Sequence, residues 1–282
     1  MGAGTPVPFS HHKEVAIVMN DEHITHLSAS AINDYTECGL LFKLGRILKV
    51  PMEFTPDALE FGSSIHKALA IFYEEKMIGS RLSLKELCDL FETHWEKAVT
   101  SHPDIKYGKG KSYDLLRPHG RELLSAYYRS LPDDPYTVLA VEEYFEFYIE
   151  GLDVPLIGYI DLMEEDESGT IVITDWKTAA KAYSFDEVNK NFQLTLYTMA
   201  MKSNGYFNRE VLCKFDCLIK TKVPRFEQYY TLRSREDELR AITRITQTWE
   251  AISKEVFTPN DTSWKCKGCV YQKACKNYLE AA

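Results

Sequence analysis

The stretch from Ile171 to Lys177 constrains the fold of this chain most strongly, because an apolar run there ends in an Asp-x-Lys pair. Side chains on a strand alternate between two faces, so Asp175 and Lys177 point the same way while Trp176 points to the opposite side. The run therefore predicts a strand that brings a carboxylate and an ammonium together at its end. The pair alone is a weak signal, since a charged chain of 282 residues contains Asp-x-Lys by chance.

A second apolar run, Leu156–Ile160, leads directly into Asp161 and then into an acidic turn with Gly169. The two runs and the turn predict a hairpin that holds Asp161 beside Asp175 and Lys177. Mg²⁺ and Mn²⁺ take oxygen ligands, commonly one or two carboxylates together with water and substrate phosphate. A nearby ammonium can orient or deprotonate the attacking water and offset charge on the phosphate. The hairpin therefore predicts a divalent-metal site suited to phosphate chemistry.

The composition limits the partners and the location of the protein. With 45% hydrophobic residues, the chain can bury a substantial core, and we expect one catalytic core that carries a helical insertion. A net charge of -9 argues against coating nucleic acid through bulk electrostatics, so any such contact must be local and focused in a cleft. No apolar run is long enough to span a bilayer, and the N-terminus lacks a basic region followed by an apolar core. We therefore expect a cytoplasmic protein without membrane contact, in which the seven cysteines stay reduced.

Hydrophobic periodicity predicts the order of the helices and strands. The predicted helices cover 28–44, 57–75, 84–99, 113–131, 185–204 and 234–256. The predicted strands cover 138–149, 156–160, 171–177, 211–219 and 225–232. On the first of these strands, acidic and aromatic side chains share one face: Glu142, Tyr144, Glu146 and Tyr148. Three strands, a helix, two further strands and a closing helix predict an α/β fold with a central mixed sheet flanked by helices.

The C-terminal cysteines form a second strong pattern. Cys266 and Cys269 are separated by two residues and Cys275 follows, so two thiolates can hold one metal centre from a tight turn. No fourth ligand follows locally, and Cys38 is our choice because it lies in a turn-like Glu-Cys-Gly context. The remaining thiols lie on apolar faces and are expected in the core: Cys88, Cys213 and Cys217. The pattern by itself leaves a four-cysteine zinc site open beside an iron-sulfur cluster.

Six motifs occur along the chain in this order: Cys38, Gly62-x-x-x-His66, Gly158-x-x-Asp161, Asp175-x-Lys177, Gln193-x-x-x-Tyr197 and Cys266-x-x-Cys269-x5-Cys275. With this combination the chain resembles the RecB-like branch of the PD-(D/E)xK nuclease superfamily over about residues 26–278. More narrowly, it resembles the iron-sulfur members of that branch, which include the AddB nuclease domain and the exonucleases of CRISPR adaptation. The resemblance implies a restriction-endonuclease-like core with a helical insertion and a C-terminal cysteine cluster.

The resemblance also implies the roles of single residues at the metal site. His66, Asp161 and Asp175 would bind Mg²⁺ or Mn²⁺. The backbone carbonyl of Trp176 would complete the protein ligands, and Lys177 would be the catalytic lysine. Taken alone, His66 would more often be an ordinary helix histidine than a ligand. Its assignment as a ligand depends on its occurrence together with the other motifs.

Further roles follow from the same resemblance. Gln193 and Tyr197, four residues apart on one helix face, would support the site or contact the nucleic-acid backbone. Four cysteines would ligate a 4Fe-4S cluster: Cys38, Cys266, Cys269 and Cys275. Two departures from the family pattern remove no ligand, because Gly39 only replaces a common proline and Asp175 stands where Glu is common.

We expect five segments along the chain. They are a flexible N-terminal arm (1–25), N-terminal helices with Cys38 and His66 (26–78), a helical insertion (79–135), the nuclease core (136–256) and the C-terminal iron-sulfur segment (257–282). The insertion carries cations that suit the wall of a DNA channel: Lys106, Lys109, Lys111, Arg117 and Arg121. A solvated face is at least as good an interpretation of these cations.

The motifs together predict a metal-dependent deoxyribonuclease, specifically an exonuclease that hydrolyses single-stranded or frayed DNA ends with a metal-activated water. The alternative is a non-catalytic module that binds DNA ends or a partner and retains the fold and the cluster. Such a module would typically have lost Asp175 or Lys177, and both are present. A redox carrier built around the cluster is a weaker alternative, because nothing marks a partner cofactor. Besides DNA, the resemblance allows a recombination or CRISPR-adaptation protein as a partner.

Overall fold

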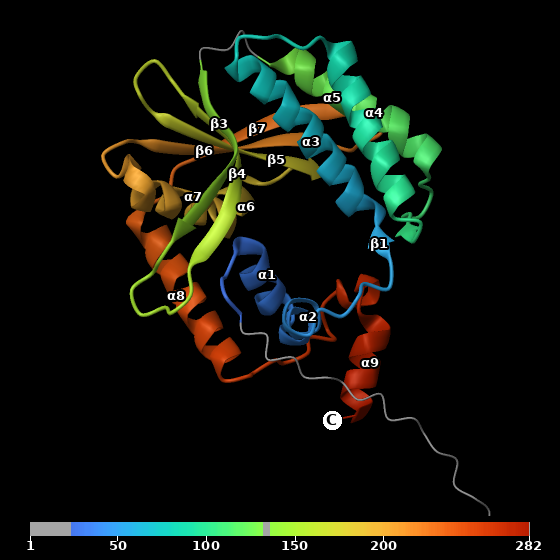
Figure 1. Cartoon of the computed structure of the whole chain (residues 1–282), viewed down its shortest axis with the longest axis vertical. Coiled ribbons are helices and arrows are strands. Elements are labelled where there is room, and N and C mark those ends of the chain that lie inside the picture. The colour runs from blue at the N-terminus through green and yellow to red at the C-terminus, as the bar shows by residue number, and fades with distance from the viewer. Residues whose placement is uncertain (1–23, 132–135, 282) are drawn as a thin grey trace, which may run out of the picture.

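A five-stranded mixed sheet forms the centre of the protein (Figure 1). The computed structural model describes residues 24–131 and 136–281, so the predicted arm at 1–25 lies outside the described residues except for its last two. In order across the sheet, the strands are β3 (Thr137–Phe147), β4 (Leu156–Glu165), β5 (Ile171–Ala179), β6 (Val211–Ile219) and β7 (Arg225–Thr231). Neighbouring strands are antiparallel, except that β5 and β6 are parallel and are joined by a helical crossover. The sheet confirms the predicted α/β fold.

The helices of the described chain lie close to their predicted positions, except that two predicted helices are broken and α9 was not predicted. They are α1 (Ala29–Glu37), α2 (Gly39–Phe42) with a π-helical turn (Lys43–Ile47), α3 (Asp57–Met77), α4 (Leu84–Ser101), α5 (Tyr113–Ser130), α6 (Phe185–Asn189), α7 (Phe192–Met201), α8 (Arg235–Ser253) and α9 (Gln272–Ala281). The helix predicted over 28–44 breaks at Cys38, whose backbone is extended (φ -163°, ψ 113°). The single helix predicted over 185–204 is wrong, because the chain breaks between α6 and α7. There the Asn191 side chain accepts a hydrogen bond from the amide of Leu194 and caps α7.

Each face of the sheet packs against a different set of helices. Helices α3, α4 and α5 cover one face, and α1, α7 and α8 cover the other (Figure 1). Strand β5 shows how the sequence serves both cores, because Trp176 packs on the α3 side while Ile173 packs on the α7 side. Asp175 and Lys177 alternate in phase with Ile173 and therefore point toward α7, as the strand period predicts.

The insertion at 79–135 is part of the core on the α3 side. Phe91, Trp95 and Tyr127 are fully buried between α3, α4, α5 and the sheet. Gly120 lets α4 and α5 approach closely, since a Cβ there would lie 2.1 Å from the Phe91 ring. A short parallel pair, β1 (Thr55–Pro56) with β2 (Ile105–Lys106), was not predicted and ties the connection between α4 and α5 to the start of α3.

Four of the five cations considered for DNA contact already have partners within the chain. Arg117 pairs with Glu92, Arg121 pairs with Asp89 and Glu92, and Lys111 pairs with Asp57, while the Lys106 ammonium lies 4.1 Å from the centre of the Phe54 ring. These contacts favour the solvated-face interpretation of the insertion over a wall of free positive charge.

Candidate metal centre

The sheet splits between β4 and β5 at the two predicted aspartates, and we call this split the fork. Pairing between β4 and β5 ends at Leu162 and Thr174, while β4 remains paired with β3 as far as its first residue. Asp161 and Asp175 are the next residues beyond the last pair, one on each strand. The amide of Trp176 donates a hydrogen bond to Oδ2 of Asp161 at 2.8 Å, so a side chain takes the place of a ladder bond.

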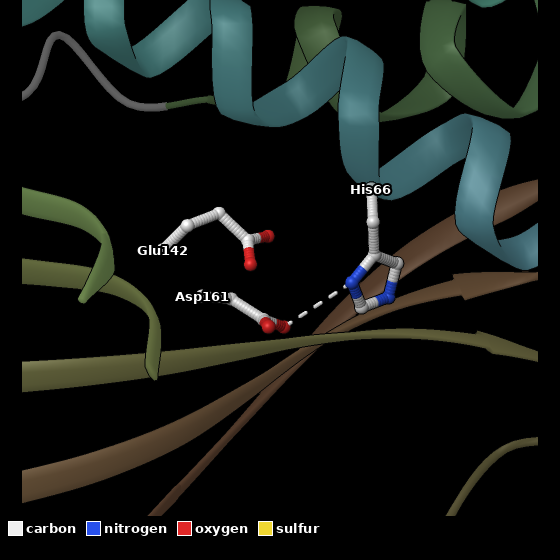
Figure 2. A group of neighbouring side chains, drawn as sticks. All are labelled: His66, Glu142 and Asp161. Atoms are coloured by element: carbon white, nitrogen blue, oxygen red, sulfur yellow. Dashed lines mark ion pairs between the residues drawn. The ribbon is translucent and has the colours of Figure 1, made fainter. Parts of the chain in front are cut away.

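The side of the fork that faces α3 holds a group of metal-binding donors. His66 on α3 brings Nδ1 within 3.5 Å of Oδ2 of Asp161. Glu142 on β3 completes the group, in which one ligand atom of each residue lies within 4.8 Å of the others (Figure 2). Carboxylate oxygens are the donors that Mg²⁺ and Mn²⁺ prefer, and an imidazole can complete such a set. The donor chemistry therefore fits a divalent ion held by His66, Glu142 and Asp161.

Glu142 was not predicted as a ligand. Its φ of 49° is in the left-handed region, which is uncommon for a residue with a side chain and often marks a functional position. A register shift in the pairing of β3 with β4 lies just before it, between Val138 and Ala140. The predicted alternation fails around Glu142, because Val141 packs on the α3 side whereas Phe145 packs on the α7 side. Only the register of β3 against β4 sets Glu142 beside Asp161.

On the side of the fork that faces α7, four predicted residues form a closed ring of contacts. Lys177 Nζ lies 2.5 Å from Oδ2 of Asp175 and donates to Oε1 of Gln193 at 3.1 Å. Nε2 of Gln193 donates to the Tyr197 hydroxyl at 2.6 Å, and this hydroxyl donates to Oδ1 of Asp175 at 3.2 Å. The ring confirms that the motifs on β5 and α7 meet in space. Both oxygens of Asp175 have partners in this ring, and Asp175 is not among the donors that lie within 4.8 Å of one another, which are His66, Glu142 and Asp161.

The fork joins side chains from opposite faces of the sheet. His66 comes from α3 on one face, whereas Gln193 and Tyr197 come from α7 on the other. A continuous ladder between β4 and β5 would keep these two sets apart. Because the strands part at Asp161 and Asp175, the two sets belong to one site.

Burial and opposite charges set the protonation of the site. Burial lowers the pKa of His66, but the hydrogen bond and the charge of Asp161 outweigh it and leave this pKa above its usual value. Burial also lowers the pKa of Lys177, and the Asp175 carboxylate more than compensates, so Lys177 is a cation at neutral pH. Burial and the nearby Asp161 raise the pKa of Glu142. A divalent cation bound between Glu142 and Asp161 would reduce the repulsion between their negative charges.

The four predicted cluster cysteines line one cavity of about 500 Å³ near the C-terminus of the chain. Cys38 caps the end of α1, Cys266 and Cys269 flank a short 3-10 turn, and Cys275 lies on α9. The amide of Asn260 donates to the Cys38 sulfur at 3.3 Å, which places the C-terminal segment directly against α1. The other thiols are buried in the core as predicted: Cys88, Cys213 and Cys217.

The spacing of the sulfur atoms bears on what the cavity can hold. Within residues 24–131 and 136–281, no three cysteine sulfurs lie within 4.8 Å of one another. A tetrahedral zinc site with Zn–S bonds of 2.3 Å needs sulfurs about 3.8 Å apart. The four thiols therefore line one cavity without forming a compact tetrahedral group in this structure.

A mixed sheet that forks at two aspartates and a lysine, between helices on both faces, defines the restriction-endonuclease-like class of fold. The chain belongs to the PD-(D/E)XK nuclease superfamily, whose family model matches residues 26–276. This match confirms the resemblance drawn from the motifs at the level of the superfamily. The narrower resemblance to iron-sulfur members stays a prediction.

Two individual proteins are similar to the chain over most of its length. "Gene 69 protein" of Mycobacterium phage D29 is 26% identical over 279 residues, which cover 88% of this chain and 95% of the phage protein. A solved structure of a "Putative exonuclease" from Eubacterium rectale has a TM-score of 0.56 at 10% identity and covers 93% of this chain and 94% of its own. The second similarity concerns the fold. None of the described helices is long and apolar enough to cross a membrane.

Proposed function

We propose that this protein is a metal-dependent deoxyribonuclease, an exonuclease that hydrolyses phosphodiester bonds at single-stranded or frayed DNA ends. The observation that carries the proposal is the fork, where a histidine and two carboxylates adjoin the paired Asp175 and Lys177. No serine, threonine or cysteine nucleophile is required by this set of residues, because a metal-bound water can attack the phosphate directly. Membership of a nuclease superfamily supports the same chemistry.

Each residue of the fork has a distinct task in this proposal. A divalent ion bound by His66, Glu142 and Asp161 would supply an activated water and a positive charge for the phosphate. Lys177 would orient that water and offset the charge that develops on the phosphate oxygens. The ion pair of Lys177 with Asp175, 2.5 Å between Nζ and Oδ2, favours this electrostatic task for its ammonium.

The remaining predicted residues position the lysine or extend the ligand set. Gln193 and Tyr197 hold Asp175 and Lys177 in one geometry through the ring of hydrogen bonds. Asp175 remains a proposed ligand that would exchange one of its present contacts for the ion. The carbonyl of Trp176 also remains a proposed ligand, and its neighbouring amide already fixes Asp161.

We further propose a 4Fe-4S cluster in the cavity lined by Cys38, Cys266, Cys269 and Cys275. Support comes from the four thiols, which belong to segments near both ends of the chain and line one cavity. In a 4Fe-4S cluster each of the four thiolates binds a different iron. Its main task would be to join the C-terminal segment to α1 and α2.

Location and partners stay expectations in this proposal. The protein would act in the cytoplasm on DNA, and a recombination or CRISPR-adaptation protein would be a partner of the kind the resemblance allows. The net charge of -9 means that affinity for DNA would come from the metal site and its surroundings rather than from the whole surface.

The test is digestion of end-labelled single-stranded, double-stranded and circular DNA by anaerobically purified protein with Mn²⁺. We expect cleavage of linear single strands, loss of cleavage with EDTA, and protection of the circles. Asp175→Ala should be inactive, while Asp166→Ala, at the β4–β5 turn, should retain activity. Cleavage of circles at the rate of linear strands would overturn the exonuclease assignment. Tight binding of DNA ends by folded protein that never cleaves would establish the binding-module alternative instead.

A further inference from the structure

Strands β3 and β4 continue past the fork as a ribbon at the edge of the sheet. The register of this ribbon sets Glu142 opposite Asp161, and two residues further along it sets Tyr144 opposite Tyr159. Phe145 and Ile160, which follow the two tyrosines on their strands, pack on the α7 side, so Tyr144 and Tyr159 point to the α3 side, where His66 contacts Asp161. The next cross-strand pair after the candidate metal ligands is therefore a pair of aromatic rings.

The two rings are in contact with each other and open to solvent. Their centroids are 5.4 Å apart and their planes are inclined at 60°. Tyr144 is 46% exposed and Tyr159 is 57% exposed. The opposite face of the ribbon is anchored in the core, where a Cβ on Gly158 would lie only 2.6 Å from the Phe145 ring. The anchored face fixes the direction in which the tyrosine rings project.

The hydroxyls of Tyr144 and Tyr148 are already engaged. The Tyr144 hydroxyl donates to one oxygen of Glu146 at 2.8 Å, and the Tyr148 hydroxyl donates to the other at 3.1 Å. These bonds tie the tips of the side chains along β3. What Tyr144 offers a ligand is consequently ring surface, and the Tyr159 ring lies beside it.

The charge of the surroundings narrows the kind of ligand. Glu142 and Glu146 flank Tyr144 on its strand, so this surface repels phosphate groups rather than attracting them. A nucleobase has no such charge, and stacking on an aromatic side chain is favourable for every base. Two strand residues, about 7 Å, separate the tyrosine pair from the pair of carboxylates, which is roughly one nucleotide of extended chain.

We propose that Tyr144 and Tyr159 form a platform on which an unpaired base stacks while the neighbouring phosphate lies at the metal centre. The proposal rests on the proposed nuclease function and deepens it by naming the substrate as an unstacked single strand. In a duplex, each base is already stacked on its neighbours and paired, so only a free or frayed strand can present a base to the platform. The platform thus selects single strands by base stacking and leaves the phosphate to the metal site.

The test measures binding and cleavage with the full chain and two paired variants. Tyr144→Ala/Tyr159→Ala removes the rings, and Tyr144→Phe/Tyr159→Phe keeps them without the hydroxyls. Tyr230→Ala is the matched control, because Tyr230 is 42% exposed on β7, at the opposite edge of the sheet. Binding of a fluorescent thymidine oligonucleotide is measured in Ca²⁺ by anisotropy, and its cleavage in Mn²⁺ by gel. The same oligonucleotide with one abasic nucleotide, moved along the strand, identifies a position that needs a base.

We expect the double Ala variant to bind about tenfold more weakly or worse, with an unchanged salt dependence. The double Phe and Tyr230→Ala variants should bind like the parent protein. One abasic position should weaken the parent protein by a similar factor and have no further effect on the double Ala variant. Equal DNA affinity of the parent and double Ala proteins would overturn the platform. So would an abasic position that weakens binding of the double Ala variant by the same factor as binding of the parent protein. A change in oligomeric state of the double Ala variant without a change in DNA binding would identify a second copy of the chain as the occupant.

Failure of the platform can be told apart from failure of the proposed function. If the protein cleaves single strands but the double Ala variant cleaves them equally well, the nuclease function is supported and the platform is contradicted. If the base-dependent binding occurs without any cleavage, the platform is supported and the nuclease assignment is contradicted.

Discussion

The amide of Trp176 and the carboxylate of Asp161 are joined by a 2.8 Å hydrogen bond across the fork. This bond gives Asp161 two tasks, since its side chain closes the gap left by the ladder and also belongs to the group of metal donors. The two tasks depend on different properties, because the hydrogen bond needs an acceptor oxygen and the metal needs a negative charge.

Two substitutions at Asp161 should separate these tasks. Asp161→Asn retains an acceptor for the Trp176 amide, so we expect near-parental thermal stability but a cleavage rate about three orders of magnitude lower, or about 4 kcal/mol in the barrier. Asp161→Ala should lose the same activity and a further 1–3 kcal/mol or so of stability, because the amide is left without its partner. Thermal unfolding and a single-turnover assay measure both quantities. An active Asp161→Asn protein would exclude the carboxylate as a ligand.

Loss of the lysine should abolish the chemistry without abolishing the metal group. Lys177→Met removes the cation that would face the phosphate in the proposed mechanism, and we expect a fall in cleavage rate of about three orders of magnitude, or about 4 kcal/mol in the barrier. Lys181→Met is the matched control, since Lys181 lies four residues further on and is exposed. The measurement is the cleavage rate at saturating Mn²⁺. A rate for Lys177→Met equal to that of the control would remove Lys177 from the catalytic set.

The metal dependence should identify the ligands. His66→Ala and Glu142→Gln each remove one donor, so each should raise the Mn²⁺ concentration for half-maximal cleavage by about tenfold or more. Glu143→Gln is the control, because Glu143 is the next residue on β3 and lies outside the donor group. An Mn²⁺ titration of cleavage compares the three variants. Identical Mn²⁺ titrations for Glu142→Gln and Glu143→Gln would show that Glu142 is not a metal ligand.

The buried thiol of Cys213 should limit stability at high pH. Burial raises its pKa to about 11, whereas an unfolded cysteine ionises near 8.5. Since the pKa is higher in the folded state, the contribution is complete below about pH 8.5 and is lost as the pH rises toward 11, by about 3 kcal/mol. Cys213→Ala should lack this part of the alkaline loss. Urea unfolding from pH 8 to 11 checks it, and parallel curves for the two proteins would contradict it.

The cysteine cavity should act as a structural clasp. Joining Cys38 to Cys266 closes a loop of most of the chain, and the chain-entropy estimate for such a link is about 5 kcal/mol. We therefore expect brown protein with about four irons per chain after anaerobic purification. Cys269→Ala should lose the colour, become sensitive to protease and lose cleavage through loss of structure. Cys88→Ala, whose thiol lies in the core between α4 and α5, should keep its iron.

Two outcomes would change this assignment in different ways. Stoichiometric zinc in the anaerobic protein would replace the iron-sulfur cluster but keep the clasp. A stable and active Cys269→Ala protein would exclude the clasp itself.

The local periods of the sequence were enough to place most of the parts. Alternation along β5 fixed Asp175 and Lys177 on one face and Trp176 on the other, because the two-residue period of a strand leaves no other arrangement. The spacing of Gln193 and Tyr197 likewise put both on one face of α7, where they bond to each other. The break between α6 and α7 escaped the prediction, because the cap formed by Asn191 interrupts an otherwise helical pattern.

Only the tertiary structure decided how these parts form one site. The sequence could not reveal that β4 and β5 separate after Leu162 and Thr174, because the extent of strand pairing depends on what fills the gap. Nor could it show that Glu142 joins His66 and Asp161, since that depends on the register between two strands and on one left-handed residue. A sequence period gives the direction of a side chain within its own element. The partner across the gap is set by packing between elements distant along the chain, which no local pattern contains.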